Sequence, residues 1–236
     1  MLTPIFGTII FVIFYFIATL LYPGGSQADK NSVGFSWINN YWCNLLNENA
    51  INGQPNPAKP VAMTGMFILC FTLSIFWFLF SKYIFVGKQL KLIIQISGII
   101  SMIIASLLFT NINHDLITNL ASLFGLIATI GTYIGLYKSR WYGLFAFGLF
   151  NLILVGLNNY VYYTKGYIIY LPVIQKISFA SFLFWVCCID LKLYRRIEPA
   201  GSTQGRIKQQ LSKPFTHHQF FTSGSVFVKT FTGFYS

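Results

Sequence analysis

Long apolar runs separated by short polar segments dominate the chain. A helix needs about 20 mostly apolar residues to cross a membrane, and six runs come close to that length. We therefore predict an all-α integral membrane bundle of six helices. The expected spans are Leu2 to Tyr22, Val61 to Ser81, Leu92 to Asn111, Ile117 to Tyr137, Trp141 to Tyr163 and Ile177 to Leu193.

The first run has a competing interpretation as a signal peptide. Signal peptides begin with basic residues and have an apolar core of about 7 to 15 residues. Residues 2–22 contain no charged residue and form a longer apolar run. We therefore predict that this segment is a retained membrane helix.

Two segments of mixed character lie between the predicted helices. Residues 23–60 form a long polar loop after the first helix. The segment TKGYIIYLPVIQK, residues 164–176, contains Pro172 and Lys176, which disfavour the core of a span. Because it also carries tyrosines, which are enriched at headgroup depth, we predict that it lies along the membrane interface.

The C-terminal segment differs in composition from the rest of the chain. From Glu198 onward it is rich in Ser, Thr, Lys and Gly and has no apolar run of spanning length. Such a segment cannot bury enough apolar surface to fold by itself. We therefore predict two parts: a six-helix domain at 1–196 and a basic, disordered cytoplasmic tail at 197–236.

Composition supports a membrane protein and excludes a water-soluble one. Of the 236 residues, 55% are hydrophobic and 9% are charged, whereas soluble domains have about a quarter charged residues. The net charge of +11 would suggest nucleic acid in a soluble protein, but no nucleic-acid motif accompanies it. The basic residues fall between the apolar runs and in the tail, so we expect membrane lipids as partners and no nucleic acid.

The distribution of basic residues predicts the orientation of the chain. Lys and Arg accumulate in the loops on the cytoplasmic side. An N-in, C-in arrangement puts eight of them near the cytoplasmic helix ends and four on the other side. It makes the loop at 23–60 extracytoplasmic, and we expect the bacterial cytoplasmic membrane as the location. The eight are Lys82, Lys88, Lys91, Lys138, Arg140, Lys192, Arg195 and Arg196, and the four are Lys30, Lys59, Lys165 and Lys176.

No cofactor or metal site is predicted. Three of the four cysteines lie in apolar runs, and only Cys43 lies in a loop, so no disulfide framework is indicated. No Cys/His spacing resembles a zinc site. Cys43 is a conceivable nucleophile, but no base is identifiable beside it, and the pair at His217 and His218 is more typical of a solvated polar stretch.

Polar side chains gather at the predicted extracytoplasmic end. Asp115, Thr118, Asn119 and Ser122 recur at helical spacing and share one face. Polar groups in a bilayer usually face a partner or a cavity, so we predict an outer-leaflet pocket covered by the loop. The candidate pocket residues are Asn40, Tyr41, Trp42, Asn44, Thr118, Asn119, Asn158 and Asn159.

These side chains also have purely structural interpretations. His114 and Asp115 could transfer a proton and are the weak catalytic candidates, but Asp115 could equally cap the fourth helix. The asparagines of the fifth helix could tie helices together. The aromatic residues of the loop could form an interfacial belt. The sequence leaves these alternatives open.

Three motifs give the chain a family resemblance. NYWCNLL (40–46), NGQPNPA (52–58) and GMFILCFTLSIFW (65–77) are similar to segments of a bacterial family of multi-pass membrane proteins catalogued as domain of unknown function 998. The resemblance covers residues 1 to about 196. It implies about six helices, a polar loop after the first and an Asn-Pro turn into the second, and it transfers no catalytic residue.

Three functions are compatible with this pattern: binding or modifying lipid headgroups in the pocket, acting as a non-catalytic scaffold or assembly factor, and transporting a small solute. A transporter should carry polar residues through the full bilayer depth, whereas these are concentrated on one side. An enzyme should show a nucleophile, base or metal set with recognisable geometry. The sequence shows none, so whether the protein is an enzyme stays open.

Overall fold

The computed structural model describes residues 1–107 and 114–211, and the described residues are helical with no named strand. By residue contacts the chain divides into two units, Met1–Arg195 and Arg196–Ser236. The α-helices are α1 (Thr3–Leu21), α2 (Ala58–Tyr83), α3 (Lys88–Ser106), α4 (His114–Lys138), α5 (Tyr142–Tyr163) and α6 (Leu171–Leu211). Two short 3₁₀-helices are η1 (Trp42–Leu46) and η3 (Lys165–Tyr170).

Six helices in the described part are long and apolar enough to cross a membrane. Their most apolar windows have mean hydropathies between 1.6 and 2.4, which is the pattern of membrane-spanning segments. The prediction of an all-α protein with six such helices is therefore confirmed.

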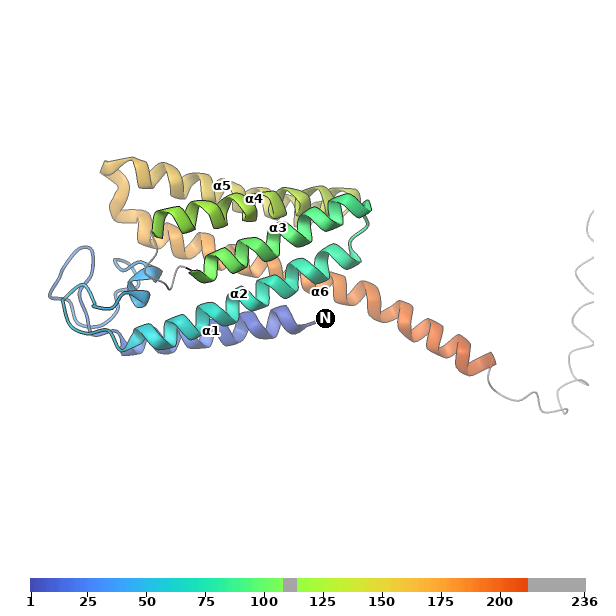
Figure 1. Ribbon diagram of the computed structural model, residues 1–236, viewed down its shortest axis with the longest axis horizontal. Helices are drawn as coiled ribbons and strands as arrows, with labels where there is room; N and C mark the ends of the chain where they lie inside the picture. Colours follow the sequence, from blue (N-terminus) through green and yellow to red (C-terminus); the bar gives the residue numbers. More distant parts are fainter. Residues whose placement is uncertain (108–113, 212–236) are drawn as a thin grey trace, which may run out of the picture. The chain divides into compact units, whose positions relative to one another are not determined.

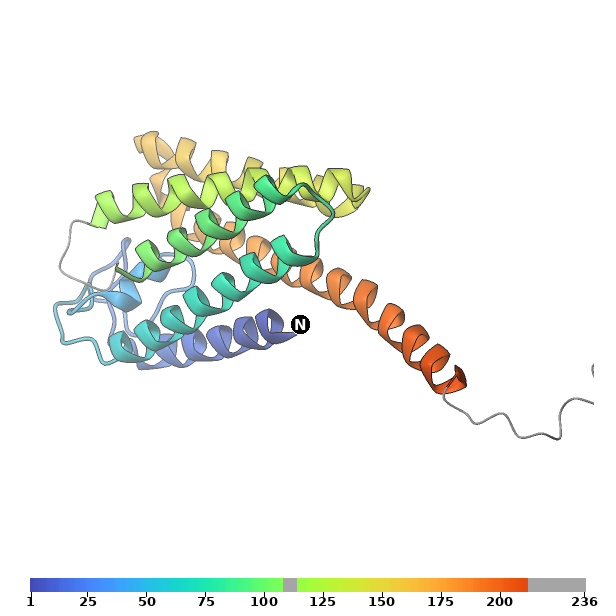
Figure 2. The ribbon, with the colours of Figure 1, turned by 45° about the vertical axis from the view of Figure 1, so that its right-hand side comes forward.

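Successive helices of the first unit alternate in direction (Figures 1 and 2). α1 packs on α2, α2 on α3 and α3 on α4, and α4 also contacts α5. The loop at 22–57 and η3 therefore lie at one end of the bundle, called the loop end below. The α2–α3 and α4–α5 turns, with Lys82, Lys88 and Arg140, lie at the other, called the basic end.

Large aromatic side chains and small residues pack the interior. Trp77 and Phe76 of α2 and Trp185 of α6 are fully buried. α3 approaches α2 at Gly98, where an added Cβ would lie 2.2 Å from Trp77 Cγ. Small residues allow such close contact between membrane helices, so Gly98 sets the spacing of this pair.

α6 differs from the prediction at both ends. It begins at Leu171 and not near Ile177, so residues 171–176 are part of a candidate span that runs from Gly166 to Ile197. Pro172 fits because a helix's first turn needs no N–H donor there. α6 also continues to Leu211, into the segment predicted as a tail, and the disorder of that tail stays a prediction. Residues 212–236 of the predicted tail lie outside the described residues.

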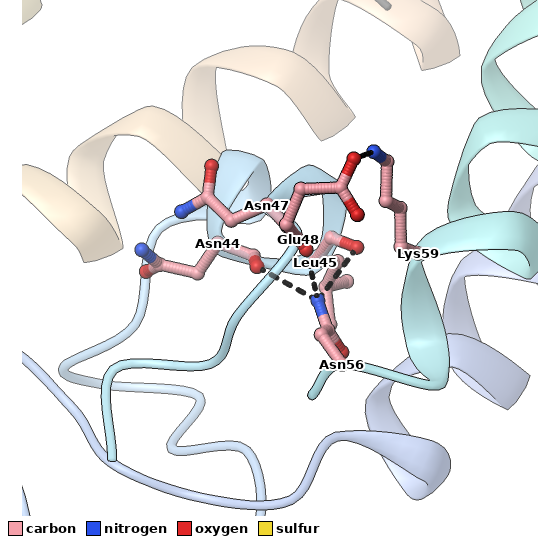
Figure 3. A network of polar contacts seen from close by, with 6 residues as sticks. All are labelled: Asn44, Leu45, Asn47, Glu48, Asn56 and Lys59. Carbon is pink, nitrogen blue, oxygen red and sulfur yellow. Dashed lines mark hydrogen bonds and ion pairs between the residues drawn. The ribbon is translucent and has the colours of Figure 1, made fainter. Parts of the chain in front are cut away.

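The loop after α1 is ordered by side-chain hydrogen bonds (Figure 3). The Asn56 amide nitrogen donates to the carbonyl oxygens of Asn44, Leu45 and Asn47 at 3.3, 3.2 and 2.9 Å. Its amide oxygen accepts from the Ala58 N–H at 3.1 Å, at the start of α2. One buried side chain thus joins η1 to the start of α2.

Candidate functional site

A cavity of about 610 Å³ opens at the loop end of the first unit. Its wall is made by the residues around η1 and by α4, α5 and α6, so four segments far apart in the sequence meet there. We call it the amide cavity. It is lined by Tyr41, Cys43, Thr118, Asn119, Asn158, Asn159, Tyr162, Tyr163, Leu171 and Gln175.

Five of the eight candidate pocket residues line this cavity: Tyr41, Thr118, Asn119, Asn158 and Asn159. The two α4 residues, Thr118 and Asn119, belong to the predicted polar stripe. They lie about one turn from the start of the helix. Asn158 and Asn159 both reach the cavity although they point about 100° apart on α5. The Asn159 amide nitrogen also donates to the Val155 carbonyl at 2.9 Å.

Asn40 and Asn44 do not line the cavity, because both are buried in the loop and hold its backbone. The Asn40 amide oxygen accepts from the Ser36 N–H, and its nitrogen donates to the Gly25 carbonyl, each at 2.8 Å. The Asn44 oxygen accepts from the Tyr41 N–H at 2.6 Å. These asparagines shape the loop that carries Tyr41 and Cys43.

Trp42 does not line the cavity either. Its ring packs against Tyr15 of α1, with centroids 5.0 Å apart, and against Trp37, at 5.7 Å. Tyr15 in turn contacts Phe11, at 4.5 Å. Trp42 therefore fixes the loop on α1 through a stack of aromatic rings.

The two weak catalytic candidates have no described side chains. α4 begins at His114, which puts Asp115 in its first turn. The side chains of His114 and Asp115 lie outside the described residues. The proposed proton-transfer and capping roles therefore both stay predictions.

Lys176 lies beside the cavity but is engaged by the protein. Its ammonium donates to the carbonyl oxygens of Asn40 and Pro172 and lies 5.7 Å from the centre of the Phe35 ring. The aliphatic stem lies along α6 while the charged group reaches the loop, as long basic side chains do near helix ends. This explains how a lysine is accommodated near the start of the span.

Burial raises the pKa values of the two titratable groups that η1 and its flank contribute. The pKa of the Cys43 thiol is raised by burial, partly offset by its own backbone amide and by the positive charge of Lys176. The pKa of Tyr41 is raised by burial and by the nearby Cys43 and Tyr162. Both groups are therefore neutral near pH 7, which suits hydrogen bonding and not nucleophilic attack.

Five lining residues were not among the predicted pocket residues: Cys43, Tyr162, Tyr163, Leu171 and Gln175. Leu171 and Gln175 are four residues apart and share a helix face, but this is visible only once α6 begins at Leu171. The Gln175 amide oxygen is buried and has no hydrogen-bond partner in the described part of the chain. Gln175 therefore lines the cavity with another part of its side chain, while this oxygen is shielded from it.

Buried hydroxyl groups deeper in the bundle bond mostly to a carbonyl of their own helix, as Thr8 and Thr132 do, and a few bond between helices. Ser181 donates to the Asn151 amide oxygen at 2.6 Å, and Ser101 donates to the Ala121 carbonyl at 2.7 Å. Asp190 of α6 makes neither kind of bond: it is fully buried, and neither carboxylate oxygen has a hydrogen-bond partner among the described residues. In the same residues no group of His, Cys, Asp and Glu could hold a metal ion.

Comparison with known proteins finds no matching family model, curated protein or solved structure. Fold and cavity together define the class: an all-helical protein with six helices able to span a membrane and an amide-rich cavity at one end. The family resemblance of the loop motifs stays a prediction.

Proposed function

We propose that this multi-pass membrane protein binds the polar headgroup of a membrane lipid in the amide cavity. The observation that carries the proposal is the cavity itself: about 610 Å³ lined mainly by amide, hydroxyl and phenol side chains at the ends of membrane helices. Helix ends lie at headgroup depth, where a lipid presents its polar part. A cavity of this volume suits one small ligand or headgroup.

The lining chemistry favours hydrogen bonding over charge pairing. Asn and Gln amides each donate and accept, and tyrosine hydroxyls do both. Among the described residues, no Asp, Glu, Lys, Arg or His lines the cavity. The nearby cation of Lys176 is already bound to two carbonyl oxygens. A headgroup rich in hydroxyl or amine groups matches this wall of amide and phenol side chains.

The proposed orientation puts the cavity in the outer leaflet. The basic end carries Lys82, Lys88, Lys91, Lys138 and Arg140, and such an excess of basic residues favours the cytoplasmic side. The loop end then faces away from the cytoplasm, in the bacterial cytoplasmic membrane. Reporter fusions after Lys91 and after Arg196 should both report a cytoplasmic position. Periplasmic signals at both would put the cavity in the inner leaflet.

Two tyrosines of α5 provide a matched test of lipid binding. Tyr162 lines the cavity and Tyr160 does not, yet they are 59% and 60% exposed. Lipids that co-purify with the detergent-solubilised chain would be identified by mass spectrometry, and the retained species titrated back. Tyr162→Leu should weaken retention about fivefold, the value of one hydrogen bond of about 1 kcal/mol, whereas Tyr160→Leu should not.

A combined variant widens the expected difference. Tyr162→Leu with Gln175→Leu removes two polar side chains from the same wall and should reduce retention further. If the Tyr160 and Tyr162 variants retain the same lipids equally, the cavity is not a headgroup site. A non-catalytic scaffold or assembly factor would then be the better account of the protein.

A second candidate function, transport of a small solute or ion, is favoured by one observation. Asp190 is a fully buried carboxylate without a hydrogen-bond partner in the described part of the chain, within a candidate span. Ionisable residues inside membranes often mark ion or proton pathways. Asp190→Asn should abolish solute or proton flux into proteoliposomes if the protein is a transporter. Absence of flux in the unaltered protein would remove this candidate.

A further inference from the structure

We propose that a second cavity, at the basic end, binds the phosphate group of an anionic phospholipid. This cavity has a volume of about 470 Å³ and is formed by the α4–α5 turn, the first turn of α5 and one face of α6. We call it the cation cavity. It is lined by Arg140, Trp141, Tyr142, Gly143, Leu144, Cys188 and Lys192.

Two cations from different elements converge on it. Arg140 comes from the turn and Lys192 from α6, and the Lys192 ammonium lies 5.7 Å from the centre of the Trp141 ring. Among the described residues neither Arg140 nor Lys192 forms a salt bridge with a carboxylate. Guanidinium groups bind phosphate in a two-pronged geometry, and lysine adds a point charge.

The backbone of the same wall also favours an anion. Tyr142, Gly143 and Leu144 are the first three residues of α5, and no side chain caps this helix start. The first N–H groups of a helix have no partner within the helix and carry partial positive charge. Phosphate is a common ligand of such groups, and here they line a cavity that also holds two cations.

Arg140 occupies a backbone position that arginine rarely takes. Its φ is +58°, in the left-handed region. The Arg140 N–H bonds to the Tyr137 carbonyl at 3.0 Å, and the Trp141 N–H bonds to the Leu136 carbonyl at 2.9 Å. This pair of bonds is the Schellman ending of α4, in which glycine or asparagine normally stands at the Arg140 position. The backbone conformation disfavours an arginine here, which points to a role for its side chain in binding.

The depth of the cavity points to a lipid as the source of the phosphate. Lys192 lies near the end of a candidate span and Cys188 about one turn deeper, so the cavity extends from headgroup level toward the acyl chains. Trp141 and Leu144 add apolar surface to the cavity wall. Basic cavities between membrane helices commonly hold anionic headgroups. A free phosphate ion would use the cations but not the apolar wall.

The test compares two pairs of neutralised cations at the same end of the protein. The full-length chain in detergent is titrated with phosphatidylglycerol and with phosphatidylcholine of equal acyl chains, and binding is followed by native mass spectrometry. Arg140→Gly and Lys192→Gln should each weaken phosphatidylglycerol binding about fivefold, and about twentyfold together. The control Lys88→Gln with Lys138→Gln removes the same charge from exposed residues outside the cavity and should have little effect.

Stability separates a binding role of Arg140 from a structural one. Glycine fits the left-handed position better, so Arg140→Gly should keep or raise the thermal midpoint while it weakens binding. A lower midpoint for Arg140→Gly, together with normal binding by Lys192→Gln, would overturn the proposal. Equal losses in the control pair would also overturn it, because diffuse charge would then explain the binding. Displacement of the lipid by millimolar inorganic phosphate would assign the cavity to a soluble anion.

Discussion

The loop at 22–57 and the helices that flank it are held by different interactions. In the loop, buried asparagine side chains bond to backbone groups: Asn56 to three carbonyls, Asn40 to Gly25 and Ser36, and Asn44 to Tyr41. Between α2 and α3, Gly98 lies directly against the ring of Trp77. The loop is held by side-chain hydrogen bonds, and the helices are held by close packing of their side chains.

This difference predicts two kinds of sensitivity to mutation. A buried hydrogen-bond network loses several partners when one side chain is removed, and the groups left behind remain unsatisfied. A packed helix interface responds to added volume and not to lost polarity. The loop should therefore be most sensitive to deletions, and the bundle to insertions of atoms.

Asn56→Ala should have the largest effect, and it tests whether side-chain hydrogen bonds order the loop. It leaves three carbonyls of the loop and the N–H of Ala58 without their partner. We expect a loss of about 3 kcal/mol in the free energy of unfolding, measured by denaturation in mixed micelles. Asn31→Ala, at an exposed position of the same loop, should change it by less than about 0.5 kcal/mol. Equal effects would mean that the Asn56 network does not order the loop.

Gly98→Ala tests whether close packing stabilises the contact between α2 and α3. The new methyl group would lie 2.2 Å from Trp77 Cγ, in a ring that is itself buried, so we expect a loss of about 2 kcal/mol in the free energy of unfolding. Gly156→Ala adds the same methyl group on α5, where no atom lies within 4 Å, and should stabilise by up to about 1 kcal/mol. If both alanines stabilise the protein, the α2–α3 contact is looser than described.

Lys176→Met examines the link between the loop and the bundle. Methionine keeps much of the apolar stem but removes the donor to the Asn40 and Pro172 carbonyls. Because one hydrogen-bonded connection is lost, we expect about 1 kcal/mol of destabilisation and faster cleavage of the loop by added protease. Lys30→Met, at an exposed loop position, serves as the control and should leave both measurements unchanged.

The smallest expected effect is a change in the titration of Cys43. Its pKa is raised by burial and lowered by the charge of Lys176, so Lys176→Met should raise the pKa further. The thiolate is the reactive form. At a fixed pH near 7, where Lys176 is charged, alkylation by a maleimide should therefore be slower in Lys176→Met than in the unaltered chain, with Cys43→Ser as the blank. Faster alkylation would show that the variant opens the loop and exposes the thiol.

The helices could largely be predicted from the sequence, because an apolar run long enough to cross a membrane has few alternatives. The exceptions have physical causes. Lys88 and Gln89 lie outside the predicted span, which begins at Leu92. In the structure they form the start of α3, because both are good helix formers. Pro172 and Lys176 read as interruptions but belong to α6, because a proline is tolerated in the first turn and the lysine reaches out to the loop.

The cavity could be predicted only in part. Thr118 and Asn119 share a face by helical periodicity, which needs no tertiary information. Gln175 could not be assigned, because its membership depends on where α6 begins. Asn40 and Asn44 were chosen for their polarity, but a polar side chain can serve the backbone as well as a ligand, and the sequence does not distinguish these uses.

The hydrogen bond from Lys176 to the Asn40 carbonyl joins residues 136 positions apart. At a synthesis rate of about 5–20 residues per second, the lysine leaves the ribosome roughly 10 s after the asparagine. During that interval the loop lacks its connection to α6. The loop end therefore reaches its final set of contacts only when α6 has been made, and a chain that stalls before α6 leaves the Asn40 carbonyl without its Lys176 donor.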